Sequence, residues 1–530
     1  MDLLEFKNGL SALDYPDYWK PVLLHQILLD NGIQSDTAVV NGDDNWTYAK
    51  LRECAYEYAF AIYNAGVPKS ARLVLDSRPC PQAISLICAC SMLGVSFTAI
   101  NPDNPPERKK EIVKTLAPAV VIDSTGSNSY DVPVFGSIQQ DKLVLKGLAG
   151  NRGILTRVLD TDVAYIVFTS GSTGTPKGIM MSQRAVVAFF KGLNERVKLG
   201  KGSVVATTSP LQFDFSLLDM GMTLGQGMKL VQTPGALLHH PVRYLDYLRK
   251  HETTQSNGVP SIMRMILVSA REGLNALGSL NTMFFGGEAL TYNDVTLLRQ
   301  VKPQMRIINI FGHTESVACS TFEVPFSHHS DRGIVPIGKP ISGMGMFVLD
   351  DNKARVKDGE IGELYIEGSA LFNGYYKDED RNRETIVPHP KYPEYCQRVF
   401  KTGDLVRRDE NGLFHFHGRR DSQIKIRGNR VELVEIEKCL LNINGIESVA
   451  VTALNGDDGE YNKIVAFLKR SNDSSCTVNL IQNRCAQKLP KYMIPSDIVF
   501  VSHIPCTANG KTDIRKLVER YLKNLEVING

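Results

Sequence analysis

The chain has 530 residues, too many for one compact core, and usual domain sizes predict roughly 3 to 4 structural units. Hydrophobic residues make up 43% of the chain and charged residues 22%, a globular composition that excludes a wholly disordered or fibrous protein. Lysine and arginine number 60 against 57 aspartates and glutamates, a net charge of +3. The charge therefore gives no reason to expect a nucleic-acid or membrane partner.

The cysteines and the N-terminal stretch indicate the compartment. Ten cysteines are scattered along the chain without a Cys-x-x-Cys pair, a pattern typical of reduced thiols rather than of disulfides or a zinc site. Residues 1–20 mix acidic, basic and apolar side chains and lack the basic start and apolar block of a secretion signal. We therefore expect a cytoplasmic protein.

One uncharged segment, residues 83–100, is 18 residues long and so lies near the lower limit for a membrane-spanning helix. It contains serines, a threonine and Gly94, and its end at 95–100 is rich in β-favouring side chains. A buried helix that turns into a buried strand explains this composition better than a membrane span.

Helical stretches alternate with short β-rich runs through the first 320 residues. The predicted helices lie at 51–66, 83–94 and 109–116, and the predicted strands at 71–75, 95–100, 119–122, 164–169, 204–207, 282–285 and 306–310. Such alternation is typical of a parallel sheet with helices on both faces.

From about residue 340 the pattern changes to short strands separated by turn residues, at 346–349, 362–366 and 413–416, which predicts a small antiparallel region. After residue 420, a helix is predicted at 434–442 and strands at 447–454 and 464–469. We therefore predict an α/β protein. We expect a large N-terminal domain, residues 1–420, with stacked mixed and parallel sheets, helices and a small antiparallel β subdomain. A hinge joins it to a small α+β C-terminal domain, residues 421–530.

The sharpest local pattern is TSGSTGTPKG at 169–178, directly after a predicted strand. Its glycines let backbone N–H groups approach an anion, its hydroxyl side chains add donors, and Lys177 adds a positive charge. The spacing is not that of a Walker A loop. We interpret the segment as a phosphate-binding loop rather than a flexible surface turn.

This loop resembles the signature loop of the adenylate-forming superfamily, which includes acyl-CoA synthetases, luciferases and the adenylation domains of nonribosomal peptide synthetases. Other segments resemble that family's motifs and follow in the family's order. They are NIFGHTE at 309–315, GELYIEG at 362–368, GYY at 374–376, FKTGDL at 400–405, GRRDSQIKIRG at 418–428, LPKYMIP at 489–495 and NGKTD at 509–513. The resemblance covers nearly the whole chain.

The resemblance implies sites for ATP and Mg²⁺. Asp404 would accept hydrogen bonds from both ribose hydroxyls, and Phe311 would offer a flat face to adenine. Glu315 would supply a hard oxygen ligand for Mg²⁺. Lys511 would bridge the substrate carboxylate and the phosphate during adenylation. The remaining implied residues are Thr314 and Lys177 for catalysis, and Thr169, Ser170, Gly171, Ser172, Thr173, Gly174, Gly286, Gly287, Glu288, Asn309, Gly312 and Arg419 for the nucleotide.

The segment LQFDFS at 211–216 resembles the F-D-x-S segment of amino-acid-activating members, in which the aspartate pairs with the substrate ammonium. Asp214 therefore favours an amino acid over a fatty or aryl acid. The other implied pocket positions, apart from Lys511, carry no charge, so a charged substrate side chain would be buried there without a partner. They are Phe215, Leu218, Ser261, Phe284, Gly286, Ile310, Ala318 and Cys319.

This wall is similar to that of free-standing prolyl-AMP ligases. L-proline is the first candidate, and valine, 2-aminobutyrate, threonine and alanine remain alternatives. We predict a ligase of natural-product biosynthesis that forms an aminoacyl-AMP with release of pyrophosphate. It then passes the aminoacyl group to a phosphopantetheine thiol.

Only 19 residues follow Lys511, fewer than a fused carrier domain needs, so a separate phosphopantetheinylated carrier protein is expected. The two steps need a moving domain, with Asp421 as the implied hinge. The alternatives are a D-alanine–carrier-protein ligase, an acyl- or aryl-CoA synthetase, or an inactive nucleotide-binding homologue. The presence of Lys511, Asp404 and Glu315 disfavours the last of these.

Overall fold

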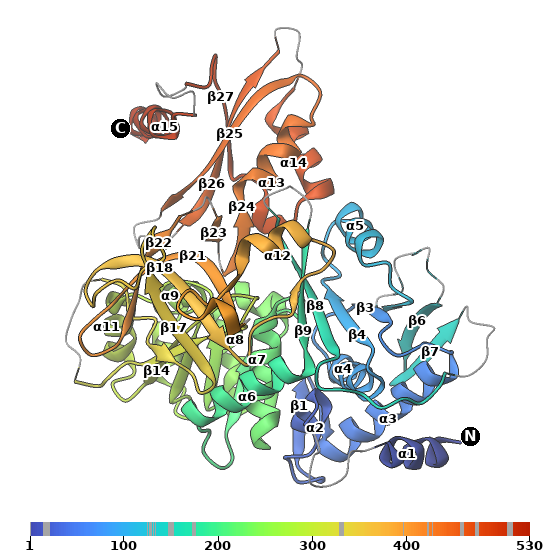
Figure 1. Ribbon diagram of the computed structural model, residues 1–530. Coiled ribbons are helices and arrows are strands. Elements are labelled where there is room, and N and C mark those ends of the chain that lie inside the picture. Colours follow the sequence, from blue (N-terminus) through green and yellow to red (C-terminus); the bar gives the residue numbers. More distant parts are fainter. Residues whose placement is uncertain are drawn as a thin grey trace. The chain divides into compact units, whose positions relative to one another are not determined.

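The computed structural model describes residues 2–13, 22–124, 126, 130, 132, 134–146, 153–171, 176–327, 333–395, 397–420, 423–426, 428–455, 461–471, 476–505 and 512–529 (Figure 1). The chain forms two compact units. Unit 1 comprises Met1–Pro102, Val113–Phe168 and Gly178–Arg420, and unit 2 comprises Asp103–Ile112, Thr169–Lys177 and Asp421–Gly530.

The larger sheet of unit 1 has nine strands in the order β16-β15-β14-β13-β12-β10-β11-β1-β2. Neighbouring strands from β14 to β1 run parallel, whereas β15, β16 and β2 are antiparallel to their neighbours. The strands are β1 (Thr37–Asn41), β2 (Asp44–Thr47), β10 (Val204–Thr207), β11 (Lys229–Gln232), β12 (Gln255–Gly258), β13 (Thr282–Phe285), β14 (Arg306–Phe311), β15 (Ser320–Glu323) and β16 (Lys339–Pro340).

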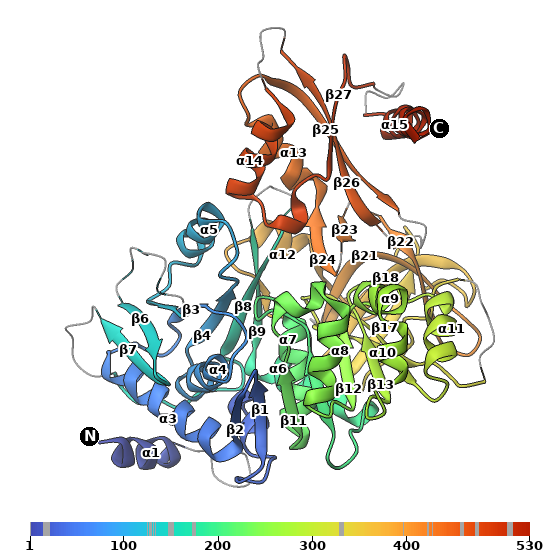
Figure 2. The same ribbon diagram turned by 180° about the vertical axis from the view of Figure 1, so that it is seen from behind.

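Four helices lie over one face of this sheet (Figure 2). They are α8 (Pro241–Lys250), α9 (Pro260–Ser269), α10 (Arg271–Asn275) and α11 (Tyr292–Val301). Proline begins both α8 and α9, at the position where a helix does not need the missing N–H. Leu248 of α8 and Met263 of α9 are buried in one cluster with Met283 of β13, so burial of apolar side chains holds this layer on the sheet.

The second sheet of unit 1 has eight strands in the order β19-β9-β8-β4-β3-β5-β6-β7. The neighbours from β8 to β6 are parallel, and β7 and β19 add antiparallel pairs. The strands are β3 (Arg72–Asp76), β4 (Ser96–Ile100), β5 (Val120–Asp123), β6 (Val134–Gln139), β7 (Lys142–Lys146), β8 (Val163–Thr169), β9 (Lys177–Ser182) and β19 (Gly374–Tyr375).

The two large sheets share one hydrophobic core. Leu75 of β3, Phe189 of α6, Leu218 of α7 and Ile308 of β14 belong to a single cluster of buried side chains. The helices of this part are α1 (Leu3–Ala12), α2 (Leu24–Leu29), α3 (Tyr48–Asn64), α4 (Pro81–Leu93), α6 (Gln183–Arg196) and α7 (Asp214–Thr223). The core thus extends to α7, which carries several of the predicted site residues.

The uncharged segment 83–100 is a buried helix followed by a buried strand, as predicted. Helix α4 runs from Pro81 to Leu93. Gly94, with a positive φ of 64°, caps its C-terminal end, and β4 follows. No helix in the described ranges combines the length and the apolar character that crossing a membrane requires.

A five-stranded antiparallel sheet completes unit 1. Its order is β17-β18-β21-β20, with β22 paired to β21. The elements are β17 (Met344–Leu349), β18 (Ile361–Gly368), β20 (Ile386–Pro388), β21 (Arg398–Arg408), β22 (Phe414–Arg419) and the helix α12 (Glu379–Thr385).

Unit 2 contains a two-stranded sheet, β23-β24, and a three-stranded sheet, β25-β26-β27. Helices α13 and α14 pack on the latter through Ile436 and Ile481, which are buried in one cluster with Leu468 of β26. Its elements are β23 (Gln423–Ile426), β24 (Asn429–Glu432), β25 (Ile446–Asn455), β26 (Tyr461–Arg470), β27 (Asp497–Phe500), α13 (Leu433–Leu441), α14 (Val478–Lys488) and α15 (Ile514–Asn529). The helix α5 (Pro106–Leu116) contains part of the Asp103–Ile112 segment.

The predicted fold class is confirmed: a large α/β part with parallel and mixed sheets, an antiparallel β region and a small α+β unit. The predicted strands at 204–207 and 282–285 have the observed bounds. The helix predicted at 51–66 starts earlier, at Tyr48, because the Thr47 side chain caps it by accepting the Lys50 N–H.

Candidate active site

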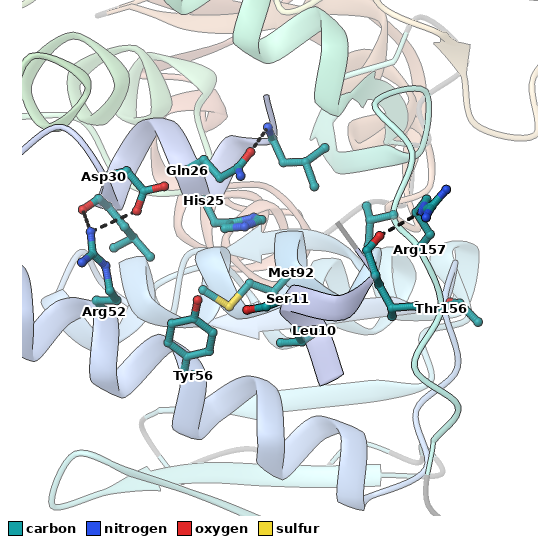
Figure 3. Close-up of a pocket in the computed structure, with 14 residues that line it drawn as sticks. Leu10, Ser11, His25, Gln26, Asp30, Arg52, Tyr56, Met92, Thr156 and Arg157 are labelled. Atoms are coloured by element: carbon teal, nitrogen blue, oxygen red, sulfur yellow. Dashed lines mark hydrogen bonds and ion pairs between the residues drawn. The ribbon is translucent and has the colours of Figure 1, made fainter. Parts of the chain in front are cut away.

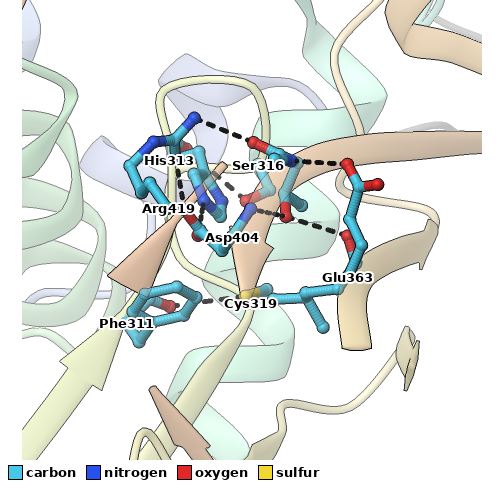
Figure 4. Close-up of polar contacts among 10 residues, drawn as sticks. Phe311, His313, Ser316, Cys319, Glu363, Asp404 and Arg419 are labelled. Atoms are coloured by element: carbon cyan, nitrogen blue, oxygen red, sulfur yellow. Dashed lines mark hydrogen bonds and ion pairs between the residues drawn. The ribbon is translucent and has the colours of Figure 1, made fainter. Parts of the chain in front are cut away.

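A buried polar cluster of unit 1 surrounds Asp404 on β21 (Figure 4). The Asp404 side chain is only 2% exposed, and its carboxylate accepts hydrogen bonds on both oxygens. Nε2 of His313 lies 2.5 Å from Oδ2, and Nη1 of Arg419 donates to Oδ1. Antiparallel pairing of β21 with β22 sets Asp404 directly opposite Arg419. Two paired strands and the distant turn that contains His313 therefore meet at one buried carboxylate.

The turn before Asp404 is held by a second carboxylate, that of Glu363 on β18. Its Oε1 accepts the Gly403 N–H at 3.1 Å, and Gly403 has a positive φ of 77° that a residue with a side chain rarely adopts. Burial raises the pKa of Glu363, and the nearby charges of Lys401 and Arg420 counteract that effect. This role of Glu363 was not predicted from the sequence.

Glu315, the predicted magnesium ligand, is fully buried. The hydroxyl of Tyr375 donates to its Oε1 at 2.7 Å. Thr314 beside it is half-buried. A carboxylate that accepts from a tyrosine hydroxyl remains a hard oxygen donor, which is the ligand type that Mg²⁺ prefers.

The predicted adenine segment begins in the last residues of β14 and continues into the turn that follows. Asn309 is buried, and its Nδ2 donates to the Pro336 carbonyl at 3.0 Å, so this amide nitrogen contacts the protein itself. The Phe311 ring meets the His313 ring edge-on, with centroids 5.2 Å apart. The Phe311 carbonyl accepts the Cys319 N–H at 2.8 Å, which closes the loop that contains Glu315.

Several predicted pocket residues come together next to α7. Asp214 is the first residue of this helix, and Phe215 follows it. A Cβ on Gly286 would lie 2.6 Å from both Phe215 and Ile310, so only glycine leaves room for these two side chains. Leu218, Phe284, Ala318 and Cys319 belong to the same buried cluster as Ile310.

Asp214 also lies near the second sheet. The pKa of the Tyr165 hydroxyl on β8 is raised, mainly by burial and secondly by the negative charge of Asp214. The acidic side chain predicted to bind an ammonium group therefore stands at the start of α7, beside an apolar wall.

Ser261, another predicted pocket residue, is bound to Glu288. Its backbone N–H and its hydroxyl donate to the two carboxylate oxygens of Glu288, at 2.9 and 3.0 Å. A carboxylate at the start of α9 also interacts favourably with the helix dipole. The predicted nucleotide segment 286–288 and the predicted amino-acid pocket are thus joined by direct hydrogen bonds.

Helix α7 also contains a buried carboxylate that was not predicted from the sequence, that of Asp219. Thr207 of β10 donates to one of its oxygens, and Nδ2 of Asn257 on β12 donates to the other at 2.8 Å. Burial raises the pKa of Asp219 to about 7, and these two hydrogen bonds counteract the effect. An acidic residue inside the otherwise apolar run LLDMGM was the available signal.

In unit 2, two of the phosphate-loop residues that the structure describes contact β24. The Ser170 hydroxyl donates to the Arg430 carbonyl at 2.8 Å, and Nζ of Lys177 lies 3.9 Å from Oε1 of Glu432. Thr169, Ser170 and Lys177 are buried. The predicted residues Ser172, Thr173, Gly174, Asp421 and Lys511 lie outside the described residues.

A cavity of about 210 Å³ in unit 1 contains none of the predicted site residues (Figure 3). Its lining includes His25, Arg52 and Tyr56 from α2 and α3. Leu13 and Leu23 also line it, and they flank residues 14–21, which lie outside the described residues.

Two family models match the chain. The model described as AMP-binding enzyme matches residues 31–376, and the model described as AMP-binding enzyme C-terminal domain matches residues 435–511. Among solved structures, that of IdnL1 is 35% identical with a TM-score of 0.82, and the match covers 92% of this chain and all of that one.

Two curated relatives differ in how much of them the chain spans. It is 29% identical over 504 residues to the L-proline–[L-prolyl-carrier protein] ligase of Pseudomonas fluorescens, covering 93% of the chain and 98% of that protein. It is 29% identical over 536 residues to the Malpinin synthetase of Mortierella alpina, covering 97% of the chain but only 7% of the synthetase. The chain belongs to the AMP-binding enzyme family.

Proposed function

The protein is a member of the AMP-binding enzyme family, and we propose that it uses ATP to activate a small neutral amino acid. L-proline is the first candidate. The substrate carboxylate attacks the α-phosphorus of ATP, an aminoacyl-AMP forms and pyrophosphate leaves. The phosphopantetheine thiol of a separate carrier protein then attacks the acyl carbon and AMP leaves. Both steps depend on positioning and charge neutralisation more than on a protein nucleophile.

The observation that carries this proposal is the combination of Asp214 with an apolar wall. A buried carboxylate that pairs with an ammonium group selects amino acids over fatty or aryl acids. The Phe215 and Ile310 side chains both lie close to Gly286, which limits the volume there and adds no charge. This arrangement supports a small apolar side chain, and the relative that acts on L-proline supports proline first.

For the nucleotide, we assign Asp404 to the ribose hydroxyls and Phe311 to the adenine ring. A carboxylate accepts hydrogen bonds without donating, so it suits a pair of hydroxyl donors. We also assign Lys511 to the reacting carboxylate and phosphate, and Lys177 with the loop hydroxyls to the phosphates.

Mg²⁺ is expected to accompany ATP, because it is usually held by one or two carboxylates together with substrate phosphates. Within the described ranges, no three His, Cys, Asp or Glu side chains gather into a metal-binding group. The Glu315 carboxylate, held by the Tyr375 hydroxyl, fits a site with a single protein carboxylate. We propose that Glu315 holds the ion, which would offset the charge of the phosphates.

The direct test is amino-acid-dependent exchange of radiolabelled pyrophosphate into ATP. The panel should include all proteinogenic amino acids, D- and β-amino acids, 2-aminobutyrate, a fatty acid and an aryl acid. We expect exchange with proline or another small neutral amino acid. Exchange with lysine, glutamate or a fatty acid, and none with proline or valine, would contradict the proposal.

A second measurement separates the carrier-loading activity from coenzyme A ligation. The activated amino acid is offered to coenzyme A and to a phosphopantetheinylated carrier protein, and thioester formation is followed by mass spectrometry. We expect loading of the carrier. Thioester formation with coenzyme A alone would favour an acyl-CoA synthetase.

A further inference from the structure

His313 sits inside the NIFGHTE segment, and nothing in the proposed reaction requires a histidine at that position. Its side chain is buried, with 9% of the residue exposed. Its Nε2 lies 2.5 Å from Oδ2 of Asp404. Nδ1 is also buried and has no hydrogen-bond partner among the described residues. Within the described part of the chain, Asp404 is therefore the one polar contact of this imidazole.

The orientation of the imidazole ring is fixed by its neighbours. The Phe311 ring meets it edge-on at 5.2 Å, and the Phe400 ring meets it edge-on at 5.7 Å. The His313 carbonyl accepts the Ser316 N–H at 2.8 Å, which holds the backbone of the turn. A ring enclosed in this way keeps Nε2 directed at the same carboxylate oxygen.

Asp404 receives a second donor on its other oxygen. Arg419 donates to Oδ1 through Nη1, and its Nη2 donates to the Thr402 carbonyl at 3.0 Å. The terminal torsion of an aspartate is broad, so a carboxylate held at one oxygen can still rotate. Donors from two different elements, one on each oxygen, fix the plane of the carboxylate.

We infer that His313 is a positioning residue that orients the Asp404 carboxylate for the two ribose hydroxyls of ATP. This inference rests on the proposed function, in which Asp404 binds the ribose. An ionised carboxylate only accepts hydrogen bonds, so the proton in the contact belongs to Nε2. A carboxylate already held in its binding orientation loses less conformational freedom when the nucleotide binds.

The test compares ATP with 2′-deoxy-ATP and 3′-deoxy-ATP in pyrophosphate exchange at saturating amino acid. His313→Leu keeps an apolar side chain in the ring's place and removes the donor. We expect it to raise the KM for ATP roughly ten- to a hundredfold, the effect of one hydrogen bond to a charged group. The preference for ATP over the deoxynucleotides should shrink, while the KM for the amino acid stays within about twofold.

A pair of amide variants tests whether a donor must reach the Asp404 carboxylate, as opposed to whether the site must only be filled. His313→Gln places a donor close to the position of Nε2 and should keep most of the ribose preference. His313→Asn carries the same amide on a side chain one methylene shorter and should lose it, as His313→Leu does. If the leucine variant does not fold, this pair still decides the question.

His415→Leu is the matched control. His415 lies on β22 and forms a similar pair with Asp409, in which Nε2 of the histidine lies 2.8 Å from Oδ2 of the aspartate. It should change neither the KM for ATP nor the ribose preference. An unchanged ribose preference in His313→Leu, or equal losses in the glutamine and asparagine variants, would overturn the inference. Failure of the proposed function looks different: wild-type protein would show no exchange, or Asp404→Ala would keep the full ribose preference.

Discussion

In the proposed function, the choice of an amino-acid substrate depends on Asp214. We expect Asp214→Ala to lower kcat/KM for the amino acid roughly tenfold to a thousandfold, because the substrate ammonium would be buried without its partner. ATP binding should stay within about twofold, since Asp404 and Phe311 are untouched. Pyrophosphate exchange and calorimetric titration of a nonhydrolysable ATP analogue measure the two quantities.

Asp214→Asn is the companion variant, because it keeps the shape of the side chain and removes its charge. It should lose activity nearly as far as the alanine variant. If both variants kept the catalytic efficiency of the wild type, Asp214 would only be the first residue of α7, with no role in binding the ammonium group.

The sequence was informative about residues whose chemistry is local, and much less so about their partners. The sequence predicts roles for Asp404 and Glu315, because carboxylates in their motifs suit a ribose and a metal ion. The contacts of His313, Glu363 and Asp219 could not be predicted, because their partners lie 91, 40 and 38 residues away along the chain. Such pairs form only when the sheets assemble, and no period or spacing in one sequence encodes them.

At the scale of elements, α7 is held to the larger sheet by Asp219, which binds Thr207 of β10 and Asn257 of β12. The same helix carries Asp214 and Leu218, two residues of the predicted amino-acid pocket. The strands and helices of this region were predictable, because apolar runs and turn residues mark them. The buried polar contacts that set the position of α7 were not.

The raised pKa of Asp219 gives the stability of the protein a dependence on pH. An aspartate normally titrates near 3.8, whereas in the fold this group titrates at about 7. Between these values the unfolded chain has lost the proton and the folded protein retains it. The free energy of unfolding therefore falls as the pH rises through this window, by a few kcal/mol at about pH 7.

Asp219→Asn tests this dependence, because an asparagine cannot ionise and can still bind Thr207 and Asn257. Below about pH 4 the wild type should be about as stable as the variant. As the pH rises from about 4 to about 7, the melting temperature of the wild type should fall relative to that of the variant. Above about pH 8 the difference between the two melting temperatures should stay constant. Asp246→Asn on the exposed side of α8 serves as the control. If the melting temperatures of the wild type and of Asp219→Asn differed by the same amount at every pH in this range, the raised pKa of Asp219 would be refuted.

At the scale of the whole molecule, adenylation and thiol transfer need different groups at the same carboxyl carbon. We propose that Lys511 serves the first step and that a movement at Asp421 permits the second. Lys511→Ala should reduce adenylation steeply and leave transfer from supplied aminoacyl-AMP largely intact. Asp421→Pro, which restricts the backbone, should affect transfer far more than adenylation.

Both half-reactions should be measured for both variants. Pyrophosphate exchange reports adenylation, and mass spectrometry of a carrier protein reports transfer. Equal losses in the two half-reactions for both variants would show that one arrangement of the molecule serves both steps.

Because Arg419 contacts Asp404 and unit 1 ends at Arg420, the chain leaves unit 1 directly from the candidate ribose site. The Arg420 N–H also donates to the Gly403 carbonyl at 2.9 Å. Tolerance to inserted residues should therefore change abruptly at this point. One glycine inserted between Gly418 and Arg419 would turn the arginine to the other face of the sheet and should abolish nucleotide binding. The same glycine inserted after Arg420 should leave nucleotide binding intact, so a designer who wishes to lengthen the connection has a starting residue.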